Sequence, residues 1–176
     1  MKGELNNNFG ELSILTDDGR FVARYSEKGL AELDFPPNRK AELRLGPDAR
    51  QRVPTKVTPA KIHRWHGITR TALKKILAGK KPGKFPPLDL AGTAFQKAVW
   101  REMRKISLSK TKSYGEIAAA IGKPKAVRAV GGACGANPVP VLVPCHRVLA
   151  AHGKIGGFGG GLDWKRNLLA REGFKR

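Results

Sequence analysis

The sequence predicts an α+β protein built from two parts. Within the first 36 residues, three short segments with alternating apolar side chains are separated by compact turn sequences, which is typical of a small antiparallel sheet. After residue 90, apolar residues recur at helical spacing and a helix-capping sequence appears. These two observations indicate a sheet with a helix in the first part and a mostly helical second part.

The predicted strands cover residues 12–15, 20–25 and 30–35. Between them lie Asp17-Asp18-Gly19 and Glu27-Lys28-Gly29, whose short polar residues and glycine suit hairpin turns. The sequence therefore predicts two consecutive hairpins.

Residues 59–77 have a helical pattern that should close at Gly79, and the Lys-, Pro- and Gly-rich residues 80–87 are expected to be a linker. We therefore expect an N-terminal α/β scaffold domain over residues 1–85. It contains no side-chain cluster that indicates chemistry.

The second part should begin with an amphipathic helix, because Phe95, Val99, Met103 and Ile106 follow helical spacing. Ser113-Tyr114-Gly115-Glu116 is a capping box, since its serine is followed three residues later by glutamate.

The capped helix should stop at Gly122, and a second helix should cover about 125–133. Helix, glycine-containing turn and helix form the helix-turn-helix pattern, although two ordinary packed helices have the same pattern. The second domain is expected over residues 92–176.

The second helix of this pair is poor in side chains that read bases. Past its first turn, Arg128 is the only long hydrogen-bond donor, and the other residues are small or apolar. Readout in the major groove needs several long polar side chains. This composition favours contact with DNA regardless of sequence over a repressor.

Charge indicates a polyanionic partner. The chain has 34 basic and 14 acidic residues and a formal net charge of +20. Residues 1–90 carry 18 basic and 10 acidic side chains, and residues 91–176 carry 16 and 4. Such a surface attracts nucleic acid because each neutralised phosphate releases counterions. A soluble protein with an alkaline surface is the alternative.

Cysteine usage excludes a disulfide scaffold, because only Cys134 and Cys145 occur. They lack CxxC spacing, and His63 and His66 have no third ligand near them in sequence, so we expect no metal.

Neither a bilayer-spanning apolar run nor a signal peptide is evident, so we expect a cytoplasmic protein without membrane contact.

An apolar, strand-like segment, residues 139–143, leads to Pro144-Cys145-His146-Arg147. A thiol beside a histidine and an arginine is placed for a low pKa and for nucleophilic chemistry. A buried cysteine that merely packs is the other interpretation, and adjacency in sequence leaves both open.

This segment resembles the active-site signature of O6-alkylguanine-DNA alkyltransferases. The signature is Asn137-Pro138 followed by Pro144-Cys145-His146-Arg147-Val148, and the similarity covers nearly all of residues 92–173. The other matching motifs are Gly92-Thr93-Ala94-Phe95-Gln96, Val99-Trp100, Ser113-Tyr114-Gly115, 122–131, 156–162, Leu168-Leu169 and Glu172-Gly173. Residues 1–85 share only a loose strand pattern with the family.

The resemblance implies a catalytic set. Cys145 would attack the alkyl carbon, and His146, through a bound water and oriented by Glu172, would take the thiol proton. Tyr114 would donate to N3 of the departing guanine, since that group otherwise leaves as an anion. Asn137 would tie the helix-turn-helix to the active-site loop.

The resemblance also implies a binding surface. Arg128 would enter the base stack where the damaged nucleotide is flipped out, at a cost of a few kcal/mol. The remaining expected contacts are Tyr114, Gly115, Lys123 and Ala151 along the DNA and Val143, Val148, Phe158 and Gly159 around the base. No cofactor is implied.

Three positions depart from the family pattern. Phe158 stands where tyrosine is usual, Cys134 where other residues are usual, and residues 106–109 replace a stretch that usually carries proline and glycine. Cys145 itself argues against the alkyltransferase-like proteins, which have tryptophan there. We interpret Cys134 as a packing residue.

The expected protein is a DNA-repair methyltransferase that acts once. The resemblance implies a ribonuclease-H-like N-terminal sheet and transfer from O6-alkylguanine, and also from O4-alkylthymine, to the protein. Its partner would be double-stranded DNA bound through the minor groove without sequence preference, by a monomer close to the nucleoid, or in the nucleus of a eukaryote. The alternatives are a damage sensor or DNA-binding regulator without transfer, and a Cys-His hydrolase.

Overall fold

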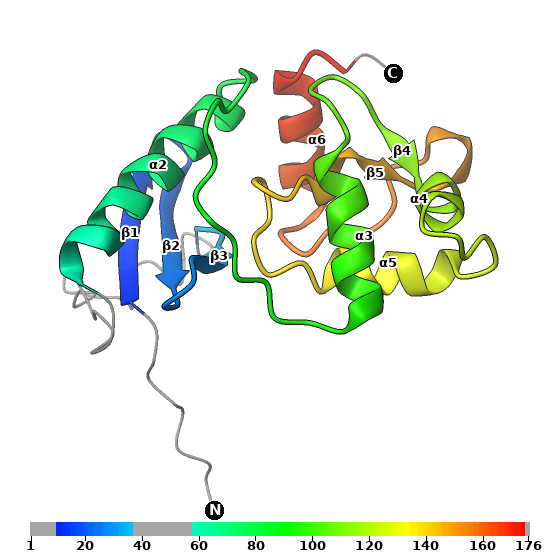
Figure 1. Cartoon of the computed structure of the whole chain (residues 1–176). Coiled ribbons are helices and arrows are strands. Elements are labelled where there is room, and N and C mark those ends of the chain that lie inside the picture. Colours follow the sequence, from blue (N-terminus) through cyan, green and yellow to red (C-terminus); the bar gives the residue numbers. More distant parts are fainter. Residues whose placement is uncertain (1–9, 37–57, 175–176) are drawn as a thin grey trace, which may run out of the picture.

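The computed structural model describes residues 10–36 and 58–174, and it contains both helices and strands (Figure 1). In chain order the elements are β1 (Gly10–Thr16), β2 (Gly19–Tyr25), β3 (Leu30–Asp34), α2 (Pro59–Leu77), α3 (Ala94–Arg104), β4 (Lys112–Ser113), α4 (Tyr114–Ala120), α5 (Val127–Gly135), β5 (Val148–Leu149) and α6 (Leu162–Arg171). Two short 3-10 turns, η1 (Cys145–Arg147) and η2 (Ala151–Gly153), flank β5.

The three expected N-terminal strands form an antiparallel sheet in the order β1-β2-β3. Thr16 pairs with Gly19, so Asp17 and Asp18 form the two-residue turn of the first hairpin. Alternate residues of β1 and β2 are buried, because one face of the sheet packs on the core, and β3 buries Leu30, Ala31 and Leu33. The strand and hairpin predictions are confirmed.

The α2 helix covers one face of this sheet (Figure 1). Its apolar side chains recur three or four residues apart, and Ile62, Trp65, Leu73 and Ile76 are buried. Pro59 occupies the first turn, where a missing N–H costs nothing, and Gly79 beyond the end has φ +67°. Both ends of this helix therefore lie where the sequence predicts them.

The segment expected to be a linker ends on the sheet. The Leu30 N–H donates to the Pro87 carbonyl at 2.8 Å, and the Asp89 N–H donates to the Leu30 carbonyl at 2.9 Å. At Gly29 an added Cβ would lie 2.3 Å from the Pro87 oxygen, so only glycine allows this close approach. The connection to the second part is thus fastened to the edge of β3.

The first two helices of the second part, α3 and α4, are capped at their starts. At α4 the Glu116 N–H donates to the Ser113 hydroxyl at 3.1 Å, and the Ser113 N–H donates to the Glu116 carboxylate at 2.6 Å, as the sequence predicts. Thr93 and Gln96 form the same box at α3. The α4 and α5 helices pack together across the turn at 121–126, where Gly122 has φ +71°.

The predicted strand over residues 139–143 is wrong. The chain folds into a tight turn in which the Val143 N–H donates to the Val139 carbonyl at 2.9 Å and Val141 has φ +71°. Pro140 and Pro144 explain the difference, because proline lacks the N–H that a central strand must donate. The segment is apolar because it is buried, not because it is a strand.

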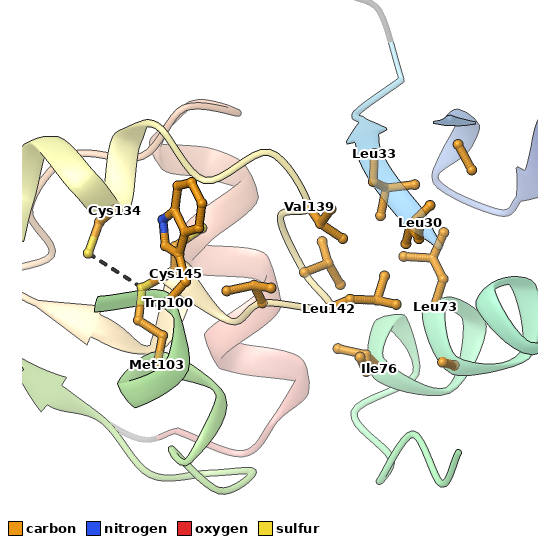
Figure 2. Close-up of a cluster of buried hydrophobic side chains, with 14 of the residues drawn as sticks. Leu30, Leu33, Leu73, Ile76, Trp100, Met103, Cys134, Val139, Leu142 and Cys145 are labelled. Atoms are coloured by element: carbon orange, nitrogen blue, oxygen red, sulfur yellow. Dashed lines mark hydrogen bonds between the residues drawn. The ribbon is translucent and has the colours of Figure 1, made fainter. Parts of the chain in front are cut away.

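The two parts share one hydrophobic core. Figure 2 shows Leu30 and Leu33 of β3 and Leu73 and Ile76 of α2 on one side, with the 139–142 turn between them and α3. The Leu33 N–H also donates to the Pro138 carbonyl at 2.8 Å. The proposed division into domains over 1–85 and 92–176 stays a prediction.

Among the helices described in residues 58–174, none has the length and apolar content needed to cross a membrane.

Candidate active site

Cys145 lies in a hollow between β3 and the segment that follows α5. The thiol residue begins the 3-10 turn after Pro144 and is 7 % exposed. The hollow has a volume of about 380 Å³. Its walls are formed by Glu32, Leu33, Asp34, Phe35, Cys134, Gly135, Asn137, Pro138, Pro140, Cys145, Phe158, Gly159 and Gly160.

Asn137 connects the end of α5 to the thiol. Its side-chain amide donates to the Val143 carbonyl at 2.8 Å and to the Cys145 sulfur at 3.2 Å, while its carbonyl oxygen accepts from the Val139 N–H at 3.1 Å. These bonds hold the turn closed. They also present an N–H donor to the sulfur, which favours the thiolate.

Behind Cys145, His146 and Glu172 form a buried pair. The Nε2 of His146 lies 2.9 Å from the Glu172 carboxylate, and both side chains are almost fully buried. Burial alone would raise the pKa of Glu172, but hydrogen bonds from His146 and Arg147 outweigh it and lower that pKa to about 2. An ionised carboxylate only accepts, so Nε2 carries the proton.

The other ring nitrogen of His146 is therefore a base. Burial lowers the pKa of His146, which keeps the ring neutral, and its Nδ1 is buried without a hydrogen-bond partner among the described residues. A neutral imidazole with an unused lone pair can accept a proton.

Arg147 fixes the carboxylate from the opposite side. Its guanidinium donates to Glu172 at 2.9 and 2.8 Å and to the Ile106 carbonyl at 2.7 Å. The Ser109 hydroxyl donates to the Glu172 backbone carbonyl. Residues 106–109, which depart from the family pattern, thus support the Glu172 end of the network. From the sequence, Arg147 was expected only to place a positive charge near the thiol, and its bonds to Glu172 were not predicted.

The expectation that Cys145 has a low pKa is wrong for the protein without bound DNA. Burial raises the pKa of this thiol, and the Asn137 amide and the Lys165 ammonium oppose that effect only in part. Neighbours in sequence do not decide the outcome, because Arg147 is directed to Glu172. The thiol therefore needs a base at the moment it reacts.

Lys165 is a site residue that sequence reasoning missed. This α6 lysine is fully buried, and its ammonium donates to the Val148 carbonyl at 2.7 Å and the Gly157 carbonyl at 3.2 Å. No carboxylate pairs with it among the described residues. Its sequence signal is weak, since its position on the buried side of α6 appears only once Leu168 and Leu169 are known to face the core.

Tyr114 begins α4 and is half-buried. Burial, together with Cys134 and Cys145, raises the pKa of its hydroxyl, so the group stays a proton donor. An added Cβ on Gly156, which has φ +65°, would lie 2.9 Å from this hydroxyl. The glycine-rich segment therefore packs directly against the tyrosine.

The expected base-pocket residues separate into two groups. Phe158 and Gly159 line the hollow, whereas Val143 and Val148 are fully buried behind it. Phe158 packs on Phe35 with ring centroids 5.6 Å apart, and Phe35 packs on Trp164 at 4.9 Å. Glu32, Leu33 and Asp34 of β3 and the following Phe35 also line the hollow, so the N-terminal part contributes to the site that it was expected only to support.

The remaining expected DNA contacts lie outside the hollow, on or near α4 and α5. Lys123, Arg128 and Ala151 are exposed, and Gly115 is partly so. Cys134 is buried, and its thiol contacts the Met103 sulfur at 3.5 Å, as expected of a packing residue (Figure 2). Burial and Cys145 raise its pKa to about 12.

No group of three or more His, Cys, Asp or Glu side chains in residues 10–36 and 58–174 could hold a metal ion. His66, one of the two histidines weighed above as metal ligands, has its Nδ1 3.3 Å from the Tyr25 hydroxyl.

Comparison with known proteins places these features in a family. The profile described as 6-O-methylguanine DNA methyltransferase, DNA binding domain, matches residues 94–174. A methylated-DNA–protein-cysteine methyltransferase of Mycolicibacterium paratuberculosis is 58% identical over 85 residues, which are 48% of this chain and 52% of that protein. One from Haemophilus influenzae is 52% identical over 86 residues, 49% of this chain and 48% of the relative.

Solved structures match over a longer range. The crystal structure of Mycobacterium tuberculosis O6-methylguanine methyltransferase has a TM-score of 0.67 at 33% identity and covers 93% of this chain and 92% of that one. The chain belongs to the O6-methylguanine-DNA methyltransferase family. A structure of Mycobacterium tuberculosis OGT in complex with DNA matches this family member with a TM-score of 0.66 at 35% identity, covering 91% of this chain and 90% of that one.

Family membership confirms the resemblance read from residues 92–173, and the structural match confirms the α+β class. The chain spans about half the length of the curated O6-methylguanine-DNA methyltransferase relatives that it matches in sequence.

Proposed function

We propose that this protein repairs DNA by moving an alkyl group from O6 of guanine to the sulfur of its own Cys145. The observation that carries the proposal is the hydrogen-bonded group around that sulfur: Asn137 donates to it, and the His146–Glu172 pair lies beside it in sequence and is buried with it. The hollow in front, with an aromatic wall at Phe158, suits a planar base.

The nucleophile is made during the reaction. The sulfur forms a bond to the alkyl carbon while the bond from that carbon to O6 breaks, and the thiol proton passes through a water to Nδ1 of His146. Glu172 stabilises the imidazolium that results, because its carboxylate is ionised and already accepts from Nε2. Asn137 donates to the sulfur as charge develops on it.

The leaving group is a purine that takes up negative charge. Tyr114 would donate a proton or hydrogen bond to its N3, and the raised pKa keeps that phenol protonated at neutral pH. Backbone groups of Val143 and Cys145 would hold the base edge, with Val148, Phe158 and Gly159 shaping the pocket.

The DNA surface would be formed by α4 and α5 as a helix-turn-helix in the minor groove. Exposed Arg128 would fill the space left by the flipped nucleotide, and Tyr114, Gly115, Lys123 and Ala151 would contact the backbone. A helix with a single long donor supports binding without sequence preference.

The transfer would happen once per molecule, because the thioether formed has no easy hydrolytic exit. We expect the protein to accept O4-alkylthymine as well, and we expect it to act on chromosomal DNA as a monomer.

Mixing the protein with excess duplex that carries a radiolabelled O6-methyl group tests the proposal. Label reaching one equivalent on protein supports it, repeated turnover indicates a hydrolase, and binding without transfer indicates a damage sensor.

A further inference from the structure

The outward side of α2 carries a stripe of cations that the proposed repair reaction does not use. The exposed cations of α2 stand at positions 61, 64, 70, 74 and 75, on the half of the helix that is turned away from the buried side, and those of the adjoining segment continue the stripe. The cations are Lys61, Arg64, Arg70, Lys74, Lys75, Lys80, Lys81 and Lys84.

Acidic residues are sparse around this stripe, although Lys74 lines a hollow together with Asp17 and Asp18. The sequence has no Asp or Glu between Asp48 and Asp89, and residues 37–57 carry six basic and two acidic side chains. No ion pair formed within residues 10–36 and 58–174 includes a cation of the stripe.

Four acidic residues in the described N-terminal part are paired elsewhere. On β2, Arg24 pairs with carboxylates from β1 and β3 at 2.7 to 3.0 Å, and Asp18 pairs with Arg171 of α6 at 2.6 Å. The carboxylates around Arg24 are Glu11, Glu32 and Asp34. These four carboxylates therefore do not offset the cations of α2, which concentrates positive potential on its outward side.

A hollow runs along the stripe, between α2 and residues 82–84, with a volume of about 410 Å³. Its cations are Arg64, Lys75 and Lys84, and an added Cβ on Gly83 would lie 3.6 Å from the Lys75 ammonium. Gly67 also lines the hollow, which is open there because an added Cβ would meet nothing within 4 Å. Three cations in one concave surface fit a phosphate better than scattered exposed lysines do.

Length and composition favour nucleic acid over a lipid surface. A helix of 19 residues is about 28 Å long, close to the roughly 34 Å of one duplex turn. A membrane-binding helix needs large apolar residues beside its cations. Most large apolar side chains of α2 are instead buried on the sheet. Beside the cations, the described residues offer Ile68, which is partly buried and lines the hollow, and the exposed Phe85 of the adjoining segment.

We propose that the basic stripe of α2 is a second nucleic-acid surface, which binds the phosphodiester backbone of a duplex other than the one being repaired. Figure 1 shows α2 at one end of the molecule and α4 with α5 at the other, so one duplex cannot be expected to reach both. One protein molecule would then hold two DNA segments together.

A capture experiment with the full chain tests this. An undamaged biotinylated duplex is immobilised, loaded with protein and washed, and a second fluorescent duplex is added. The variant Arg64→Gln/Lys75→Gln/Lys84→Gln removes the cations of the hollow. The matched control, Lys97→Gln/Arg101→Gln/Arg104→Gln, removes the same charge from exposed positions of α3.

We expect the control to capture the second duplex like the natural protein and the stripe variant to capture about tenfold less. The slope of log affinity against log salt for the second duplex should fall by about two to three in the stripe variant alone. Both variants should still accept methyl groups at the natural rate. Methyl transfer is measured separately, so its failure in the natural protein would count against the repair function and not against the stripe.

Equal capture by the two variants would overturn the proposal, as would no capture by the natural protein. Vesicles rich in phosphatidylserine serve as the second ligand. Vesicle binding that depends on Arg64, Lys75 and Lys84, without capture of a second duplex, would assign the stripe to membranes instead.

Discussion

His146 donates a hydrogen bond from its Nε2–H to the Glu172 carboxylate at 2.9 Å and keeps Nδ1 without a partner among the described residues. The direction of this bond decides which way a proton can move at the site. Arg147 holds the carboxylate in place through a buried ion pair, so the histidine cannot turn without breaking its buried hydrogen bond to a fixed carboxylate.

Acid should weaken the fold through Glu172. Its pKa is about 2 in the folded protein and about 4.5 in an unfolded chain. The unfolded chain therefore binds more protons as the pH falls through this window, so stability present above pH 4.5 is lost toward pH 2, by about 3 kcal/mol at most. Urea unfolding of the natural protein and of Glu172→Gln at a series of pH values checks this. The variant should be less stable at neutral pH and nearly flat across that window, and a parallel loss in both proteins would contradict the assignment.

Lys165 should tune the thiol. The positive charge of Lys165 partly offsets the rise that burial causes in the pKa of Cys145. Lys165→Met removes that charge, so the thiol pKa should rise further and the pH profile of transfer should move to higher pH. A shift of one unit corresponds to about a tenfold slower transfer at neutral pH. Lys165→Arg keeps the charge and is the matched control, and thermal midpoints report whether each variant folds. An unmoved profile in a folded Lys165→Met protein would remove this role.

Asn137 should support both the turn and the sulfur. Asn137→Ala breaks the bonds to Val143 and Cys145 and leaves the Val139 N–H without its acceptor, at a cost of about 1 to 3 kcal/mol. Asn137→Asp is nearly isosteric but puts a negative charge beside the sulfur, so its transfer should be slower than that of the alanine variant at equal thiol exposure. Single-turnover rates compared with unfolding free energies separate the two effects. Faster transfer by the aspartate variant would show that the amide does not stabilise the thiolate.

Local patterns in the sequence were enough to predict the strands, the hairpin turns, α2 and the capping box at Ser113. Each of these depends on spacing or on turn chemistry within a few residues. The turn at 139–143 was missed because buried apolar residues look alike in a strand and in a folded turn, although Pro140 and Pro144 carried the signal.

The candidate site was only partly predictable. The roles of Cys145, His146, Tyr114, Asn137 and Glu172 came from the family resemblance, because residues as far apart as 146 and 172 meet only through the fold. The raised pKa of Cys145 and the buried charge of Lys165 depend on packing that no local pattern reveals. The lining supplied by β3 was missed for the same reason.

Cys134 should not accept an alkyl group, although it lines the same hollow as Cys145. Its pKa of about 12 leaves almost no thiolate at neutral pH, and its sulfur faces Met103. Cys134→Ala should retain transfer at one equivalent and lose about 1 kcal/mol or less of stability from packing. Peptide mapping after alkylation should find no modified Cys134 in the natural protein. Label on its peptide would make it a second acceptor.

Arg128 should matter for duplex DNA above all. If it fills the space left by a flipped base, Arg128→Ala should slow repair of a duplex more than repair of a single strand, which has no stacked partner to replace. Lys125→Ala, an exposed cation in the same turn region, controls for lost charge. Equal slowing on both substrates would indicate a simple phosphate contact.

The intact mass of the protein after incubation with duplex containing O6-methylguanine tests the transfer to Cys145 most directly. We predict a gain of one methyl group, located by fragmentation on Cys145, and no gain in Cys145→Ala, which should still bind DNA. An unmodified natural protein, or an equal gain in Cys145→Ala, would contradict it.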